Sequence, residues 1–242
     1  MSTTMHPGTE ESIAPPDGVR IRAPARLHFG FLDLHGGLGR RYSSLGLSLE
    51  QPATALRLRR APTLRVSGPD SDRVRDCARR LAERLGLPAA AEITVEQAIP
   101  AHAGLGSGTQ LALAVGLGLA RLYRRALAAR EAAVLLGRGA RSGIGVGAFE
   151  QGGFLIDGGH GPDTAVPPII CRLPFPEDWR LLLVYDPARA GLSGESEREA
   201  FARLPVFPPE RAAQLCRLVL IRLLPALAEG DAAGFGAALA EL

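Results

Sequence analysis

The sequence predicts a mixed fold in which strands and helices alternate along the chain and form two lobes. With 242 residues, 46% of them hydrophobic, the chain is long enough to bury a core. Segments with apolar residues at every second position alternate with segments at helical spacing. Five prolines between residues 162 and 176 interrupt this pattern, and we place the boundary between the lobes there.

The chain begins with a polar segment, and the first predicted strands and helix follow it. Residues 1–18 contain Pro, Gly, Ser and acidic residues without a hydrophobic stretch, so we expect a disordered tail and no signal peptide. A cytoplasmic location follows as an expectation. Alternating apolar residues predict strands at 19–26, 55–59 and 92–97, with a helix at 72–85 between the last two.

The middle of the chain contains a glycine-rich turn at 100–110 that leads directly into a helix. The helix has a buried stripe formed by Leu111, Val115, Leu119 and Leu122. The remaining elements that we expect are helices at 130–139, 211–227 and 232–242 and strands at 154–157 and 181–185.

The basic residues exclude several chemistries. The chain has no lysine, so all 28 basic residues are arginines. A P-loop lysine, a Schiff-base lysine and a pyridoxal phosphate anchor are therefore impossible. Arginine binds phosphate and carboxylate in a bidentate manner, so a phosphate-rich substrate stays compatible.

The net charge and the hydropathy of the chain limit the classes of partner that we expect it to bind. A formal net charge of +3, with basic residues spread among acidic ones, does not favour nucleic-acid binding. No apolar run is long enough to span a bilayer, so we expect no membrane partner. Cys77, Cys171 and Cys216 are few and far apart, which favours reduced thiols over disulfides or a cysteine-rich metal site.

Three clusters carry the candidate chemistry, and the first is the turn at 100–110. Its glycines let the backbone approach an anion, Ser107 and Thr109 supply hydroxyls, and the first helical turn has free N–H groups. This pattern is typical of a phosphate-binding loop. An ordinary capped core helix with a flexible entry loop explains the same pattern about equally well.

The second cluster lies at 23–34. Arg26 and His28 are two residues apart, so on a strand they face the same side and are able to meet one anion. Taken singly, Arg26 is as easily a surface charge and His28 a hydrogen-bonded core histidine. The neighbouring glycine-rich turns favour the binding role.

The third cluster lies at 138–161 and is too rich in glycine for a simple helix or strand. Its glycines surround Arg141, Ser142, Asp157 and His160. Such a loop can wrap around a ligand, although it can also serve only to connect a helix to the strand at 154–157.

Together the three clusters resemble the GHMP superfamily of galactokinase, homoserine kinase, mevalonate kinase and phosphomevalonate kinase. The family's phosphate loop begins P-x-x-x-G-L-G-S, and Pro100 and residues 104–107 match it in register, with Gly108 and Thr109 replacing a serine and an alanine. The predicted phosphate-binding residues are Gly104, Leu105, Gly106, Ser107, Gly108 and Thr109. The resemblance covers residues 19–242 and implies an α+β fold, with an N-terminal lobe at 19–165 and a ferredoxin-like C-terminal lobe at 175–242 that is cut short.

The chain departs from the kinases at residues 142–145. Many family kinases have S-G-x-D here, and the aspartate orients or deprotonates the attacking hydroxyl, whereas this chain has Gly145. Homoserine kinases also lack that aspartate. The segments ARLHFGFLDL and RSGIGVGAFEQGGFLIDGG, together with residues 191–194, resemble a more specific GHMP family, the β-ribofuranosylaminobenzene 5′-phosphate synthases of tetrahydromethanopterin biosynthesis.

That resemblance implies a decarboxylating phosphoribosyl transfer. 5-Phosphoribosyl 1-diphosphate and 4-aminobenzoate would give a C-riboside phosphate, pyrophosphate and CO2, with Mg²⁺ assisting the leaving group. We expect a homodimer from the habit of the family. The candidate catalytic residues are Arg26, His28 and Asp157, with Asp157 as a ligand of Mg²⁺ or ribose hydroxyls or else a turn former. The candidate substrate-binding residues are Arg141, Ser142 and Gly143.

Two alternatives stay open. The first is a GHMP kinase that phosphorylates a small molecule with ATP. The second is a non-catalytic binding protein on the same scaffold, because the family's third glycine-rich motif is not found before Leu242.

Overall fold

The computed structural model describes residues 18–184, 191 and 199–242. Its six strands form one sheet in the order β3-β4-β2-β5-β6, with β1 paired to β2 outside this path. The strands are β1 (Val19–Asp33), β2 (Tyr42–Arg60), β3 (Arg65–Ser67), β4 (Ala91–Gln97), β5 (Phe154–Asp157) and β6 (Ile169–Leu173).

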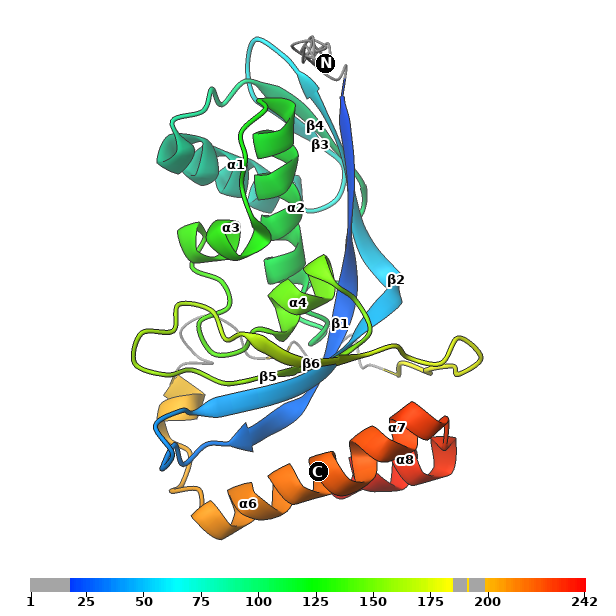
Figure 1. Ribbon diagram of the computed structural model, residues 1–242. Helices are drawn as coiled ribbons and strands as arrows, with labels where there is room; N and C mark the ends of the chain where they lie inside the picture. The colour runs from blue at the N-terminus through cyan, green and yellow to red at the C-terminus, as the bar shows by residue number, and fades with distance from the viewer. Residues whose placement is uncertain (1–17, 185–190, 192–198) are drawn as a thin grey trace, which may run out of the picture.

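A long antiparallel hairpin of β1 and β2 runs through the whole molecule (Figure 1). Its register extends from the pair Val19–Leu58 at one end to Asp33–Tyr42 at the other. Two other strands pair with the edge of β2 that does not face β1. Strand β4 pairs with residues 55–60 of β2, and β5 pairs with residues 45–47. One hairpin therefore carries two smaller sheet regions, one at each end.

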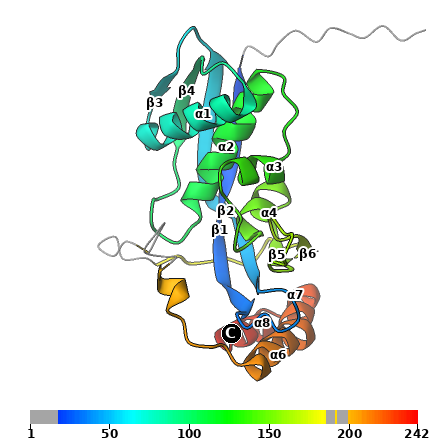
Figure 2. The same ribbon diagram turned by 90° about the vertical axis from the view of Figure 1, so that its left-hand side faces the viewer.

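Helices cover the two ends of this hairpin separately (Figures 1 and 2). One group lies over the β3–β4 end and the middle of the hairpin, and the other lies beyond the β5–β6 end. The first group is α1 (Ser71–Leu85), α2 (Ser107–Leu122), α3 (Ala129–Leu135) and α4 (Ile144–Glu150). The second group is α6 (Pro209–Leu218), the π-helical turn η1 (Val219–Leu223), α7 (Leu224–Glu229) and α8 (Ala232–Ala240).

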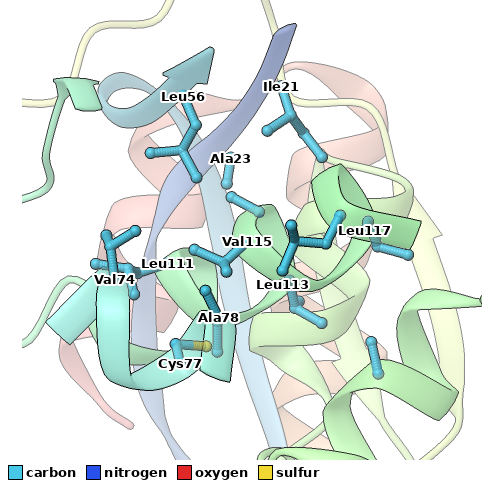
Figure 3. Packing of buried hydrophobic residues seen from close by; sticks show 14 of the residues in the cluster. Ile21, Ala23, Leu56, Val74, Cys77, Ala78, Leu111, Leu113, Val115 and Leu117 are labelled. Atoms are coloured by element: carbon cyan, nitrogen blue, oxygen red, sulfur yellow. The ribbon is translucent and has the colours of Figure 1, made fainter. Parts of the chain in front are cut away.

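Helix α2 is the centre of the first core (Figure 3). Nearly all its residues from Gln110 onward are buried, as expected for a helix that is apolar on every side. Gly118 lets it approach the sheet closely, since a Cβ there would lie 2.8 Å from Cδ1 of Leu58. The start of α2 is thereby fixed in space by a rigid core.

A second core joins the C-terminal helices to the other end of the hairpin. Phe154 of β5 is fully buried, and the Phe235 ring of α8 lies edge-on to it at 5.8 Å between centroids. Leu45, Leu47 and Leu223 belong to the same cluster. The mixed sheet with helices segregated onto its two ends is the α+β architecture that the sequence predicts.

The expected elements agree with most of the structure. The helices at 72–85, 130–139, 211–227 and 232–242 are present within a few residues, and the strand at 154–157 has the predicted bounds. Two predicted strands, at 19–26 and 55–59, are parts of the longer β1 and β2. The sequence patterns did not reveal β3, β6 or α4.

The strand predicted at 181–185 is wrong for residues 181–184, and Tyr185 lies outside the described residues. Leu182 is 89% exposed and Val184 is 87% exposed, so this apolar run is not covered as a sheet strand would be. The proline-rich connection contains β6, which pairs with β5 in the common sheet. The division into lobes at this connection stays a prediction.

Candidate functional site

The glycine-rich turn ends in an uncapped helix start. Gly106 is the N-cap of α2, with φ of 77°, and it has no side chain to accept a hydrogen bond from the first turn. The N–H groups of Thr109 and Gln110 both donate to its carbonyl oxygen, at 3.1 and 3.2 Å. The N–H groups of Ser107 and Gly108 belong to the open end of the helix, where an anion is favoured.

Arg26 is hydrogen-bonded to this turn through its backbone and its side chain. Its backbone N–H donates to the Leu105 carbonyl at 3.1 Å, and its guanidinium donates to the Gly104 carbonyl at 2.7 Å. Its side chain also packs on Gly106, where a Cβ would lie 3.1 Å from the Cγ of Arg26. The first two sequence clusters are therefore in contact, and the geometry gives Arg26 the role of a residue that positions the loop.

Two further arginines flank the helix start, and no sequence pattern singled them out. A Cβ placed on Gly108 would lie 3.6 Å from Nη1 of Arg138 and 3.6 Å from Nη2 of Arg73. Arg73 comes from α1, where it pairs with Asp70 at 2.9 Å, and Arg138 follows α3. Three separate elements thus bring positive charge and N–H donors to one point, which favours a polyanion.

His28 lies on the same strand as Arg26 and is neutral. The backbone N–H of Gly30 donates to its Nδ1 at 3.2 Å, so the proton is on Nε2. Burial and the nearby charge of Arg26 lower the pKa of His28 from 6.5 to about 4. Nε2 is buried without a hydrogen-bond partner among the described residues, which leaves a donor for a ligand.

Asp157 at the end of β5 is fully buried, and its carboxylate is used inside the protein. Its oxygens accept from the N–H groups of Ser44 at 3.0 Å, Gly143 at 2.8 Å and Gly159 at 2.9 Å. The hydroxyls of Ser44 and Ser142 also donate to it. This set of donors supports the turn-forming alternative and leaves little capacity for Mg²⁺ or ribose hydroxyls.

The predicted substrate-binding residues separate into two kinds. The Ser142 hydroxyl donates to Asp157 and accepts from the N–H of Ile144 at 3.2 Å, so it is used inside the protein, next to the start of α4. Gly143 allows a close backbone contact, since a Cβ there would lie 2.3 Å from the Pro167 carbonyl oxygen. Only Arg141 lines a hollow, together with Tyr42 and residues 201–207.

The third cluster also reaches the phosphate loop. The Gln110 side chain donates to the Gly145 carbonyl at 2.7 Å, and a Cβ at Gly145 would lie 3.1 Å from Cγ2 of Thr109. Gly191 donates to the His102 carbonyl at 2.8 Å, which brings the start of the 191–194 motif to the same loop. Residues 192–194 lie outside the described residues.

Within residues 18–184, 191 and 199–242, no group of three or more His, Cys, Asp or Glu side chains is placed to hold a metal ion. Across that part of the chain, no helix has the length and apolar character required to cross a bilayer.

The chain is similar to known proteins over most of its length. The family model described as GHMP kinases N terminal domain matches residues 72–153, which include the phosphate loop, α2 and Gly145. A β-ribofuranosylphenol 5′-phosphate synthase of Archaeoglobus fulgidus is 39% identical over 235 residues, which cover 91% of this chain and 74% of the relative. The chain belongs to the β-ribofuranosylphenol 5′-phosphate synthase family.

A second member of the β-ribofuranosylphenol 5′-phosphate synthase family gives a similar match. The synthase from Methanothermobacter thermautotrophicus is 33% identical over 244 residues, covering 92% of this chain and 74% of the relative. The crystal structure of Streptococcus pneumoniae phosphomevalonate kinase has the same fold, with a TM-score of 0.62 at 10% identity over 92% of this chain and 76% of that one. The family match and the fold therefore confirm the resemblance to the GHMP superfamily.

Proposed function

We propose that this chain catalyses a decarboxylating phosphoribosyl transfer. 5-Phosphoribosyl 1-diphosphate and a benzoate with an electron-donating group opposite its carboxylate would give a C-riboside 5′-phosphate, pyrophosphate and CO2. The relatives are named for a ribofuranosylphenol product. A phenol product corresponds to 4-hydroxybenzoate as acceptor, in place of the 4-aminobenzoate that the sequence resemblance implies.

One observation at the site carries the proposal. The anion-binding start of α2, flanked by Arg73 and Arg138, packs against Gly145, where many GHMP kinases have their aspartate. The site thus offers phosphate binding without that base. This supports a reaction in which a diphosphate departs over one in which an alcohol is deprotonated and phosphorylated.

The proposed reaction balances without a base. The C1–O bond breaks and its electron pair leaves with pyrophosphate, so C1 becomes oxocarbenium-like. The ring carbon that bears the carboxylate forms a bond to C1, helped by the electron-donating group. The bond to the carboxylate then breaks, CO2 departs, and its electron pair restores the aromatic ring. No proton is removed from either substrate.

Six residues of the site have a part in this scheme. Ser107 and Gly108 donate N–H groups to the departing diphosphate, while Arg73 and Arg138 balance its growing charge. The Nε2–H of His28 donates to a substrate oxygen, and its low pKa keeps the imidazole neutral at physiological pH. Arg26 keeps the loop in place.

Mg²⁺ is part of the proposal as a companion of the diphosphate. The hydroxyls of Ser107 and Thr109 suit a hard cation, and diphosphate oxygens and water would complete its shell. When bound, the ion would withdraw charge from the leaving group. A homodimer also stays a prediction.

A turnover assay with carboxyl-labelled acceptors tests the proposal. We expect equal amounts of labelled CO2 and pyrophosphate from 5-phosphoribosyl 1-diphosphate, with 4-hydroxybenzoate and 4-aminobenzoate compared as acceptors. ATP should not replace the phosphoribosyl donor. Tight ATP binding together with no release of CO2 from either acceptor would instead favour the kinase alternative.

A further inference from the structure

The amide side chain of Gln110, in the first turn of α2, is a polar group that the scheme above does not use. It is fully buried, although it directly follows the loop residues that are predicted to bind phosphate. Its Nε2 donates to the Gly145 carbonyl oxygen at 2.7 Å. That bond fixes the orientation of the amide, because a reversed amide would place two carbonyl oxygens against each other. Figure 1 shows α4, which contains Gly145, next to the end of α2 where this helix begins.

The carbonyl oxygen of the same amide is unpaired. Oε1 of Gln110 is buried and accepts no hydrogen bond from any described residue. Buried acceptors without a donor are rare, because such an atom loses its hydrogen bonds to water and gains none in return. The described part of the chain supplies no donor for this oxygen, which leaves it for a donor that a ligand brings.

Two buried nitrogen atoms near the loop have the opposite requirement. Nε of Arg138 and Nε2 of His28 are donors without an acceptor among the described residues. Arg138 lies beside Gly108. His28 is close enough to Arg26, which is bonded to the loop, for that charge to lower its pKa.

These atoms restrict the chemistry of a ligand that pairs with all of them. Phosphate oxygens satisfy the two nitrogen donors, but an ionised diphosphate has no donor to offer to Gln110. A ligand that satisfies both requirements therefore carries a diphosphate and a hydroxyl close to it. A sugar diphosphate has this combination, whereas free pyrophosphate does not.

We propose that Oε1 of Gln110 accepts a hydrogen bond from the 2-hydroxyl of a pentose whose C1 carries the diphosphate on the loop. The assignment rests on the proposed function for the identity of the sugar. C2 is bonded to C1, so its hydroxyl is the donor nearest to the diphosphate, just as Gln110 is the residue next to the loop.

The contact between Thr109 and Gly145 lies beside the amide and is partly open to solvent. Both residues are half-buried, and a Cβ at Gly145 would lie 3.1 Å from Cγ2 of Thr109. Because Oε1 of Gln110 is covered, binding of the hydroxyl includes a local separation of these two residues. The core around the rest of α2 stays as it is.

An amide suits the proposed transfer better than a carboxylate would. A carboxylate is able to take a proton from a hydroxyl, whereas an amide oxygen only orients it, in keeping with a reaction that removes no proton. A hydrogen bond donated by the 2-hydroxyl leaves more electron density on its oxygen. This eases the positive charge that develops at C1, so the contact strengthens in the transition state.

Calorimetric titration in the presence of Mg²⁺ tests the assignment with three probes: 5-phosphoribosyl 1-diphosphate, its 2-deoxy analogue and pyrophosphate. The wild type should bind the 2-deoxy analogue about 3- to 10-fold more weakly than the full donor, the range expected for one hydrogen bond. Gln110→Met has a similar length and no amide acceptor. It should bind both sugars with the same Kd and change the Kd of pyrophosphate by less than about twofold.

Gln214→Met, at an exposed glutamine of α6, is the matched control and should keep the wild-type preference for the full donor. Equal binding of the two sugars by the wild type would overturn the assignment whether or not the Gln110 variant folds. It is also overturned if Gln110→Met keeps the preference, or if this variant weakens pyrophosphate as strongly as the phosphoribosyl donor, which indicates a purely structural role.

The proposed function is judged separately by CO2 release. A preference that depends on Gln110, without any CO2 release, refutes the transfer reaction and leaves the sugar contact in place. CO2 release without the preference refutes the sugar contact alone.

Discussion

His28 shows how burial sets the charge of a single residue. The folded protein stabilises the neutral imidazole, because desolvation and Arg26 both disfavour the cation and lower its pKa to about 4. In the unfolded chain the pKa returns to about 6.5. The neutral histidine therefore stabilises the fold above that value, and this contribution is lost as the pH falls through 6.5 toward 4.

We expect the free energy of unfolding to fall by about 1 to 2 kcal/mol between pH 7 and pH 5 because of His28. Urea denaturation at the two pH values measures this change. His28→Gln should flatten the dependence, whereas the same substitution at exposed His35 should leave it as in the wild type. A His28→Gln protein with the full wild-type dependence would contradict the assignment.

The buried carboxylate of Asp157 connects several secondary-structure elements. Its carboxylate joins the end of β5 to β2 through Ser44 and to the turn before α4 through Ser142 and Gly143. That joint holds Arg141 at the hollow and Gly145 against the phosphate loop. A buried carboxylate with several donors is costly to alter, because each donor left unsatisfied loses its solvation without compensation.

Asp157→Asn keeps the shape but replaces one acceptor by an NH2 group that would face N–H and O–H donors. We expect it to lower the free energy of unfolding by about 3 kcal/mol, measured by urea denaturation. Asp178→Asn, at an exposed aspartate, is the control and should change it by less than about 0.5 kcal/mol. A loss at position 157 no larger than that of the control would mean that the joint is not structural.

Local patterns predicted the elements whose signal lies within one segment. The strand at 154–157 was found because a short apolar run stands between glycines, and α2 because its apolar residues repeat at helical spacing. The three residues of β3 are too few to show a period, and the apolar run at 181–184 has no covering surface. Periodicity alone does not indicate which apolar runs become buried.

The tertiary structure explains why some residues of the candidate site could not be predicted from the sequence. The glycine-rich turn was visible as a motif; α2 is a core helix with an open, glycine-lined start, and phosphate binding at that start stays a prediction. Arg73, Arg138 and Phe201 were not visible, because their relation to the loop and to Arg141 exists only after distant segments pack together. Conversely, Asp157 is of a residue type that is common in active sites, but its hydrogen-bond partners show a structural role.

The central claim is that the start of α2 grips a departing diphosphate. Its most direct test is the calorimetric affinity of pyrophosphate and of 4-hydroxybenzoate for the wild type and for Ser107→Ala. In the presence of Mg²⁺, we expect the Kd of pyrophosphate to rise about tenfold or more, because the variant lacks the hydroxyl that would hold the ion accompanying the diphosphate, while the Kd of the benzoate stays unchanged. Equal weakening of both ligands, or no effect on pyrophosphate, would contradict the claim and leave the loop with only a structural role.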